Sequence, residues 1–249
     1  VSVQDFGGDR KLVGTKFSWG RQAGKNGDYA VEEDEAGHDQ QNSFLHGIIL
    51  ADMSSKFRNV TIAGLPGAGS STLGINLAKA IGWEYFSGGD FMREYAIAKG
   101  LFDKNNQMHH PATVYSDDFD RQVDYSIRER LVKDNGLIVD SWLSGFLAQG
   151  TDGVLKVLMR CSNDAVRVDR IVNRDNVSVD RAKDHIFERE EKNLTKWTRM
   201  YQKEWREWVG KSKIDFYSPN LYDLVIDTYS HDRAGTLNLV LQKLGRKHV

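Results

Sequence analysis

Residues 62–74 read IAGLPGAGSSTLG, a glycine-rich stretch with the spacing of a phosphate-binding loop. A Walker A loop consists of a glycine, four residues, a second glycine, a lysine and a serine or threonine. Gly64 and Gly69 have this spacing and Ser71 occupies the serine or threonine position, but Ser70 stands where the lysine is expected. The stretch therefore predicts either a phosphate loop without its lysine or a structural glycine turn.

The segments on either side of the loop favour phosphate binding. Residues 60–63 predict a short apolar strand and residues 71–81 predict a helix, which is the order that a phosphate loop requires. The glycines allow several backbone N–H groups to face one anion, and the helix dipole adds to the attraction. The Ser71 hydroxyl is a candidate Mg²⁺ ligand. Arginines elsewhere in the chain could replace the positive charge of the missing lysine.

The composition limits the class of partner. The chain has 249 residues, a formal net charge of -1 and a pI of about 6.7, so no general basic field favours nucleic acid and phosphate binding has to be local. The apolar runs are too short and too interrupted to predict a membrane span. The single cysteine, Cys161, suits a reducing compartment and is expected to be a buried structural thiol. We expect a cytoplasmic protein.

Residues 1–52 differ in composition from the rest of the chain. They are rich in glycine and polar residues, they lack proline, and their acidic residues outnumber the basic ones. No helical or alternating period runs through them, so we interpret them as a polar N-terminal extension or an added leader. Met53 is either a natural start or an ordinary residue within a longer tail.

From Met53 onward, predicted strands and helices alternate along the chain. This alternation predicts an α/β fold in which helices cover both faces of a parallel sheet. The expected strands are 60–63, 83–87, 136–141, 154–161 and 221–230, and the expected helices are 71–81, 90–99, 118–134, a helical region up to about 208 that is interrupted near 175–178, and 232–244.

These motifs, in this order, resemble the archaeal-type cytidylate kinases, a family of P-loop nucleoside-monophosphate kinases that typically carries a hydroxyl residue at the lysine position. GLPGAGSST is similar to the family's loop, EYFSGGDFMRE to its Y-x-S-x-G-(D/E)-x-x-R-E stretch, and DFDRQVD to its D-R-x-x-D helix. VRVDRIVNRD followed by FEREE resembles the lid, and LYDLVIDT resembles the last strand. The resemblance covers about residues 59–228.

The resemblance implies a P-loop NTPase three-layer fold over residues 53–249. This fold has a five-stranded parallel sheet, a small domain that binds the nucleoside monophosphate, and a mobile helical lid at about 163–200. It implies ATP with Mg²⁺ as phosphoryl donor and CMP or dCMP as acceptor. The expected nucleotide-binding residues are those of the loop: Gly64, Gly67, Ala68, Gly69, Ser70, Ser71 and Thr72.

The candidate acceptor residues follow the second predicted strand. Arg93, near the start of a helix, is expected to grip the acceptor phosphate as a bidentate fork, although a solvated helix arginine has the same pattern. Ser87 and Asp90 fit a helix N-cap as well as a ligand role. Arg121 and Asp124, three residues apart on a charged helix, are candidates for contact with the acceptor base, although such pairs are commonly surface salt bridges.

Asp140 and Trp142 lie at the end of the third predicted strand. The carboxyl edge of a parallel sheet is the expected ligand crevice, so Asp140 is a candidate for holding Mg²⁺, together with Ser71, or the acceptor. Trp142 stands where the family resemblance implies an arginine, and a tryptophan cannot bind phosphate as a cation. It could stack on a base or simply pack, which leaves the identity of the acceptor open.

Arginines recur along the helices that resemble the lid. Arg167, Arg170 and Arg174 share one helical face, with Arg189 further along the chain. Such a row could be a solvated face paired with nearby acids, but the resemblance implies that the lid supplies arginines to the transferring phosphoryl group. Arg170, Arg174 and Arg189, with Asp140, are therefore the expected catalytic residues.

Two further features have ordinary explanations. Trp197, Tyr201, Trp205 and Trp208 form an aromatic stripe at helical spacing, which indicates core packing or a dimer face. The adjacent pair at 109–110 (His-His) lacks a third ligand at a metal-binding spacing and is interpreted as part of a loop.

The sequence thus predicts a nucleoside-monophosphate kinase for CMP or dCMP that acts as a monomer or homodimer, without a nucleic-acid or membrane partner. A P-loop kinase for another small acceptor, or a nucleotide-binding subunit without catalysis, remains the alternative.

Overall fold

The computed structural model describes residues 56–100 and 111–246, all of which belong to one compact unit that spans Leu50–Val249. The N-terminal segment 1–52 and the histidine pair at 109–110 lie outside the described residues, so the expectations for them stay predictions.

A five-stranded parallel sheet forms the centre of this unit, with the strand order β2-β3-β1-β4-β5. Its strands are β1 Asn59–Gly64, β2 Glu84–Ser87, β3 Leu137–Asp140, β4 Val154–Arg160 and β5 Leu224–Asp227. The register pairs Ile62 of β1 with Asp140 of β3, and Asp140 with Ser87 of β2. The central position of β1 places the glycine loop that follows it between the carboxyl ends of its neighbours.

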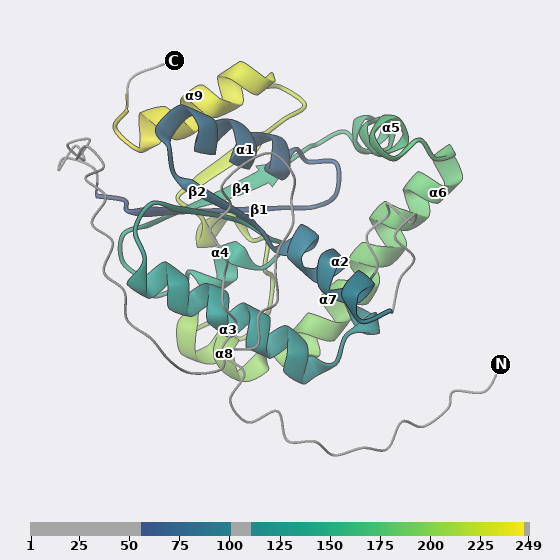
Figure 1. Cartoon of the computed structure of the whole chain (residues 1–249), viewed down its shortest axis with the longest axis horizontal. Coiled ribbons are helices and arrows are strands. Elements are labelled where there is room, and N and C mark those ends of the chain that lie inside the picture. Colours follow the sequence, from purple (N-terminus) through teal and green to yellow (C-terminus); the bar gives the residue numbers. More distant parts are fainter. Residues whose placement is uncertain (1–55, 101–110, 247–249) are drawn as a thin grey trace, which may run out of the picture. The chain divides into compact units, whose positions relative to one another are not determined.

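Helices connect the strands, as parallel pairing requires. They are α1 Ser70–Ile81, α2 Gly88–Ala98, α3 Asp117–Lys133, α4 Ser144–Leu147, α5 Asp164–Asp175, α6 Val179–Lys183, a π-helical turn Asp184–Glu188, α7 Arg189–Met200, α8 Gln202–Trp208 and α9 Arg233–Lys243, with short 3₁₀ turns at Ala112–Val114 and Pro219–Leu221. In Figure 1, α1 and α9 cover one face of the sheet, and α3, α4 and α8 lie on the other.

Local sequence signals explain where several helices begin and end. The Ser116, Asn163 and Asp232 side chains accept hydrogen bonds from backbone N–H groups in the first turns of α3, α5 and α9. Asn176 adopts a left-handed conformation that ends α5, and Ser178 caps α6. The interruption expected near 175–178 is therefore confirmed.

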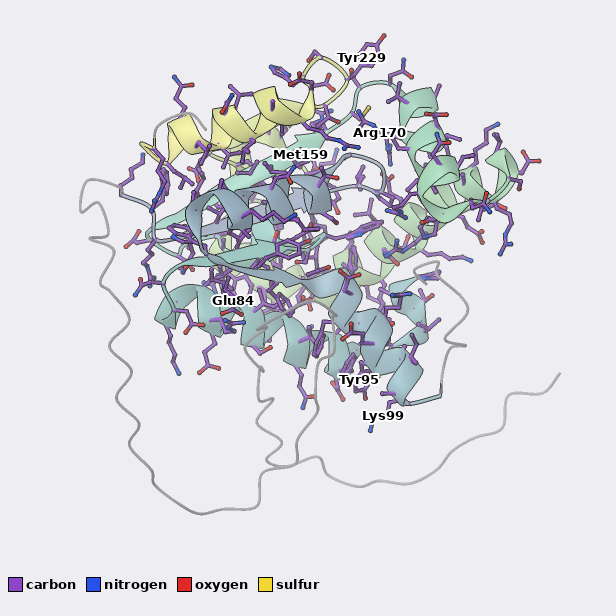
Figure 2. All side chains as sticks on the ribbon, turned by 45° about the horizontal axis from the view of Figure 1, so that its top comes forward. Glu84, Tyr95, Lys99, Met159, Arg170 and Tyr229 are labelled. Atoms are coloured by element: carbon purple, nitrogen blue, oxygen red, sulfur yellow. The ribbon has the colours of Figure 1, made fainter. Side chains whose placement is uncertain are left out.

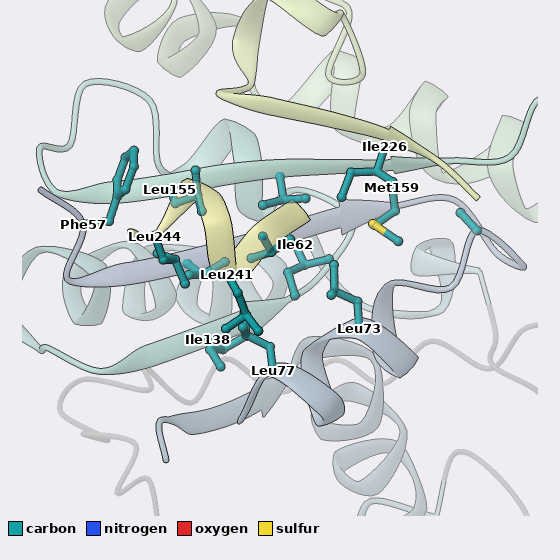
Figure 3. Close-up of a cluster of buried hydrophobic side chains, with 14 residues drawn as sticks. Phe57, Ile62, Leu73, Leu77, Ile138, Leu155, Met159, Ile226, Leu241 and Leu244 are labelled. Atoms are coloured by element: carbon teal, nitrogen blue, oxygen red, sulfur yellow. The ribbon is translucent and has the colours of Figure 1, made fainter. Parts of the chain in front are cut away.

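The main core lies between the sheet and the helices α1 and α9. Ile62, Leu77, Leu155 and Val240 are fully buried there, in a cluster drawn in Figure 3. Burying such a side chain stabilises a fold by about 1.5–3 kcal/mol. The core therefore fixes β1 and α1, and with them both ends of the glycine loop.

The helical segment from α5 to α7 has a small apolar cluster of its own, in which Val168 and Ile171 pack with Ala182 and Ile186. In Figure 1 this segment extends to one side of the sheet. Its internal packing holds α5, α6 and the π-helical turn together.

Several expectations from sequence need correction in detail. The second expected helix begins at Gly88 rather than Asp90, because Ser87 caps it by accepting a hydrogen bond from the Asp90 N–H. The last strand ends at Asp227, because the Asp227 carboxylate accepts the N–H groups of Ser162 and Tyr229 and turns the chain.

The aromatic stripe is core packing along most of its length. Trp197, Tyr201 and Trp205 are buried, and Tyr201 and Trp205 pack on Phe146 of α4 with ring centroids 5.6 and 5.7 Å apart. Cys161, expected to be buried, is half-buried because β4 ends at the residue before it. Within residues 56–100 and 111–246, no helix is long and apolar enough to cross a membrane.

Candidate active site

The glycine loop after β1 has the backbone geometry of an anion cradle. Gly67 and Gly69 have φ values of 80° and 92°, a backbone conformation that residues with a side chain rarely adopt. A Cβ on Gly67 would also lie 2.8 Å from the Arg167 carbonyl oxygen, so no larger residue fits there. No side chain caps the start of α1, which leaves its first N–H groups available to an anion.

A groove of about 730 Å³ opens above this loop. It is lined by six of the seven loop residues expected to bind nucleotide: Gly64, Gly67, Gly69, Ser70, Ser71 and Thr72. The seventh, Ala68, is buried beneath the groove, where its carbonyl oxygen accepts a hydrogen bond of 3.0 Å from the Thr228 hydroxyl. We call this hollow the donor groove.

Two arginines of α5 hold the loop by its carbonyl oxygens. Arg167 Nε donates to the Pro66 oxygen at 3.1 Å, and Arg170 Nη1 donates to the Gly67 oxygen at 2.9 Å. Arg170 also donates to the Thr228 hydroxyl and carbonyl oxygens at 2.8 and 2.9 Å. Figure 2 shows Arg170 near Tyr229, the residue that follows Thr228. Because the carbonyls are bound by α5 and by Thr228, the residue after β5, the loop is held with its N–H groups toward the groove.

Arg170 therefore holds the loop in this structure, in addition to lining the donor groove. Sequence reasoning named Arg170 as a catalytic residue and did not predict the loop contacts of Arg167 or Thr228. The arginine row from 167 to 174 was the signal for Arg167, and the LYDLVIDT stretch, which ends at Thr228, was the signal for Thr228.

Asp140 lies beside the loop at the end of β3. The Tyr85 hydroxyl donates a hydrogen bond of 2.9 Å to Asp140 Oδ2. The pKa of the Asp140 carboxyl is raised above its ordinary value because burial outweighs the hydrogen bonds from Ser71, Tyr85 and Ser70. The two candidate Mg²⁺ ligands, Ser71 and Asp140, are thus brought together, and Ser70 in the lysine position contacts the same carboxylate.

Tyr85 reaches Asp140 because α1 has a glycine where the ring passes. A Cβ on Gly74 would lie 2.3 Å from Tyr85 Cε2, closer than real Cβ contacts come. Sequence reasoning did not single out Tyr85, although the motif that carries the family resemblance contains it.

Arginines from the helical segment face the donor groove. Arg174 lines it and forms an ion pair with Asp175, with N–O distances of 2.7 and 2.8 Å. Arg189 also lines it, and burial and the nearby Arg174 charge lower its pKa to about 10. The Arg189 guanidinium is therefore cationic at neutral pH, on the same groove as Asp140.

A second, smaller pocket of about 90 Å³ lies next to the donor groove, between α2, α3 and α7. Arg93, Asp124 and Trp142 all line it. Among the described residues, the buried Nε of Arg93 has no hydrogen-bond partner, as expected of a group that awaits an anion. Ser87 and Asp90 line the donor groove instead. We call the second hollow the acceptor pocket.

Two residues of α3 contribute carboxyl groups to the lining of the acceptor pocket. Asp120 forms a buried ion pair with Lys196 of α7, at 2.9 Å. Asp124 Oδ2 accepts a hydrogen bond from the Tyr201 hydroxyl, and burial raises the pKa of the Asp124 carboxyl to about 7. Near neutral pH this carboxyl can therefore exist in either protonation state.

Arg121, expected beside the acceptor, lies in neither hollow. Its guanidinium pairs with the Glu204 carboxylate and donates to the Met200 carbonyl oxygen. The cause is the packing of α7 and α8 on α3: Met200 ends α7 and Glu204 lies in α8, and both present acceptors to the side of α3 that carries Arg121.

The residues described contain no group of three or more His, Cys, Asp and Glu side chains that could hold a metal ion. One carboxylate and one hydroxyl beside a phosphate loop do suit Mg²⁺, which commonly takes only one or two protein ligands and completes its shell with phosphate oxygens and water. Asp140 and Ser71 fit that pattern.

Comparison with known proteins identifies related chains. The sequence model of the cytidylate kinase-like family matches residues 59–230. A cytidylate kinase from Haloarcula marismortui is 30% identical over 182 residues, which cover 73% of this chain and 86% of that protein. A cytidylate kinase from Methanothrix thermoacetophila is 31% identical over 182 residues, 73% of this chain and 95% of that protein.

A solved structure supports the fold alone. The crystal structure of an uncharacterized protein from Eubacterium ventriosum superposes with a TM-score of 0.50 at 12% identity, covering 76% of this chain and 99% of that one.

Proposed function

The chain belongs to the cytidylate kinase-like family, and we propose that it is a nucleoside-monophosphate kinase that transfers the γ-phosphoryl group of ATP to CMP or dCMP. The observation that carries this proposal is that the donor groove and the acceptor pocket are adjacent and share the residues at their boundary, Trp142 and Arg189 among them. A phosphoryl group can pass directly between two ligands bound in this way.

The donor groove binds the ATP phosphates. Backbone N–H groups of the loop and of the first turn of α1 contact the phosphate oxygens, and Arg174 and Arg189 neutralise their charge. Ser71 and Asp140 would hold the accompanying Mg²⁺, which when bound neutralises phosphate charge and orients the phosphates.

The acceptor pocket binds the monophosphate. The Arg93 guanidinium faces the acceptor phosphate, for which its free Nε supplies a donor. The Asp124 carboxyl is available to the base, where a carboxylate accepts a hydrogen bond from the amino group of cytosine. Trp142 and Trp197 provide the aromatic walls of this pocket.

Transfer needs positioning and charge neutralisation more than covalent chemistry. An oxygen of the acceptor phosphate attacks the γ-phosphorus, the bond to the bridging oxygen breaks, and ADP and the diphosphate leave. Residues 163–200 act as the lid, which excludes water so that the phosphoryl group is not lost to hydrolysis. A small acceptor other than CMP is the second candidate, because Trp142 lines the acceptor pocket where the family resemblance implies an arginine.

A panel of acceptors tests the proposal. The purified chain with ATP and Mg²⁺ is offered CMP, dCMP, UMP, AMP, GMP and dTMP in separate reactions, and the diphosphate products are quantified. We expect turnover with CMP and dCMP alone. Turnover with another monophosphate reassigns the acceptor, and the absence of any diphosphate overturns the kinase assignment for these nucleotides.

The variant Arg93→Met tests the phosphate assignment within the same assay. Loss of a charged hydrogen bond, worth about 1.5–3 kcal/mol, should raise the acceptor KM by at least about 10-fold and leave the ATP KM unchanged. Arg206→Met is the matched control, because Arg206 is exposed on α8 and its Nε donates to the Gln202 carbonyl oxygen. Equal acceptor KM values for the two variants would show that Arg93 does not bind the phosphate.

A further inference from the structure

Four described residues line both the donor groove and the acceptor pocket: Gly89, Ser141, Trp142 and Arg189. A group passing from one hollow to the other passes these residues. Arg189 is the charged member of this set, and Trp142 is its large aromatic member. The contact between Arg189 and Trp142 therefore affects the passage of a group from one hollow to the other.

The Arg189 guanidinium lies over the Trp142 ring, with its Cζ atom 4.9 Å from the ring centroid. This distance is within the range of a cation–π interaction. The same ring meets Trp197 edge-on, with centroids 5.5 Å apart and an interplanar angle of 69°. Trp142 thus contacts α7 at two points, since Arg189 and Trp197 belong to the same helix.

Trp142 connects α7 to the catalytic end of the sheet. It follows Asp140, the last residue of β3, by two positions, and Asp140 is hydrogen-bonded within the core by Tyr85. The Trp142 ring is therefore anchored on the same strand end as the candidate Mg²⁺ ligand. The contact with this ring therefore fixes the Arg189 guanidinium relative to the sheet as well as relative to α7.

A ring suits this position better than either kind of charged side chain. A carboxylate under Arg189 would neutralise the guanidinium and compete with phosphate oxygens for its N–H groups. A second arginine would repel it, as Arg174 already does. The face of an indole attracts the cation without pairing its charge as a carboxylate would, and Arg189 Nη1 also lies 3.4 Å from His185 Nε2.

We propose that Trp142 is a positioning residue that holds the Arg189 guanidinium at the boundary between the donor groove and the acceptor pocket. The inference rests on the proposed phosphoryl transfer. In the ground state the ring fixes the cation, and during transfer Arg189 meets the charge on the moving phosphoryl group without first having to be ordered.

Kinetics of Trp142 variants test the proposal. Trp142→Leu removes the π face and keeps an apolar side chain. We expect kcat to fall by between about 2-fold and 30-fold, the range of a cation–π interaction, with little change in the KM for ATP. Trp142→Phe retains an aromatic face. Its decrease in log kcat should therefore be at most half of the decrease in Trp142→Leu. Equal loss in the Leu and Phe variants would contradict a role for the ring.

A double-mutant cycle separates positioning from a general packing effect. Once Arg189→Met has removed the guanidinium, Trp142→Leu should cause no further fall in kcat. Additive losses would mean that Trp142 acts independently of Arg189, and the proposal would be wrong.

The chain supplies a matched control pair away from the site. The Arg128 guanidinium lies over the Trp208 ring at 4.0 Å, and neither residue lines the donor groove or the acceptor pocket. Trp208→Leu therefore removes a cation–π contact of the same kind, and we expect kcat within 2-fold of the parent. If kcat fell as much in Trp208→Leu as in Trp142→Leu, the loss would follow from reduced stability of the fold and not from the position of Arg189.

A structural readout keeps the test independent of the kinase activity. The side-chain Nε–Hε resonance of Arg189, assigned by its loss in Arg189→Met, should show a ring-current shift in the parent protein. This shift should disappear in Trp142→Leu and persist in Trp208→Leu. An unchanged resonance in Trp142→Leu overturns the proposal whatever the acceptor is. A parent protein that shows the shift but makes no diphosphate refutes the proposed function instead.

Discussion

The Asp124→Asn substitution should change how stability depends on pH. Burial raises the pKa of the Asp124 carboxyl from its ordinary 3.8 to about 7, with a smaller contribution from Asp120 and opposing contributions from Tyr201, Lys196 and Arg121. The folded state therefore holds a proton that the unfolded chain releases near pH 4. This contribution to stability is fully present below pH 3.8 and is lost as the pH rises through 7.

The size of the effect follows from the difference between the two pKa values. Each pKa unit corresponds to about 1.4 kcal/mol, and integrating proton release between pH 4.5 and pH 7.5 gives a loss of about 3 kcal/mol. An asparagine at position 124 has no proton to lose and can still accept the Tyr201 hydrogen bond. The parent should therefore lose about 3 kcal/mol more than Asp124→Asn over this interval.

Urea unfolding at pH 4.5, 5.5, 6.5 and 7.5 measures this difference directly. Asp118→Asn is the matched control, because Asp118 is an exposed acid in the first turn of the same helix. The free energy of unfolding of this control should follow the parent across the pH range. Parallel curves for the parent and Asp124→Asn would refute the reasoning, since they would show that the two states hold the Asp124 proton equally.

Three further substitutions probe buried contacts. Tyr85→Phe removes the hydroxyl that orients Asp140. Because a hydrogen bond to a charged group contributes about 1.5–3 kcal/mol, steady-state kinetics should show kcat/KM for ATP with Mg²⁺ lowered by roughly 10- to 100-fold. Gly74→Ala places a methyl group against the Tyr85 ring and should lower the free energy of unfolding by about 1–3 kcal/mol in urea. Lys196→Met leaves the buried Asp120 without its cationic partner and should cost about 3–5 kcal/mol in the same assay.

Each of these substitutions has a control. Tyr229→Phe alters a mostly exposed tyrosine and should leave kcat/KM unchanged. The cost of Gly74→Ala should shrink in a Tyr85→Ala background, and an undiminished cost would point to a cause other than the ring. Lys192→Met breaks an exposed ion pair with Glu188 and should cost less than about 1 kcal/mol, so a similar cost for Lys196→Met would show that its pair with Asp120 is not buried in solution.

The sequence was sufficient to predict the elements whose signals are local. The glycine loop lies between β1, which ends at Gly64, and α1, which begins at Ser70, as its pattern indicated. Asn176 and Ser178 interrupt the helical segment where expected. The parallel sheet followed from the alternation of strands and helices. In each case the determining residues are neighbours along the chain, so their patterns can be interpreted without a structure.

The contacts that shape the site join residues far apart in sequence, and for that reason they could not be predicted. The Tyr85 hydroxyl meets a carboxylate 55 residues away, and the Thr228 hydroxyl meets the Ala68 carbonyl oxygen 160 residues away. Arg121 carries the expected motif, but Glu204, 83 residues further on, determines where its guanidinium lies. A motif identifies which residue types are present, whereas the packing of distant elements decides what each side chain contacts.

Transfer of label from the γ-phosphate of ATP tests the central claim most directly. The purified chain is incubated with γ-labelled ATP, Mg²⁺ and CMP, with a parallel reaction that lacks CMP, and label is counted in CDP and in inorganic phosphate. We predict one labelled CDP for each ADP formed, and little labelled phosphate in either reaction, because the donor groove and the acceptor pocket meet at Arg189 and Trp142. Release of label as inorganic phosphate at the same rate with and without CMP would contradict direct transfer between the two hollows.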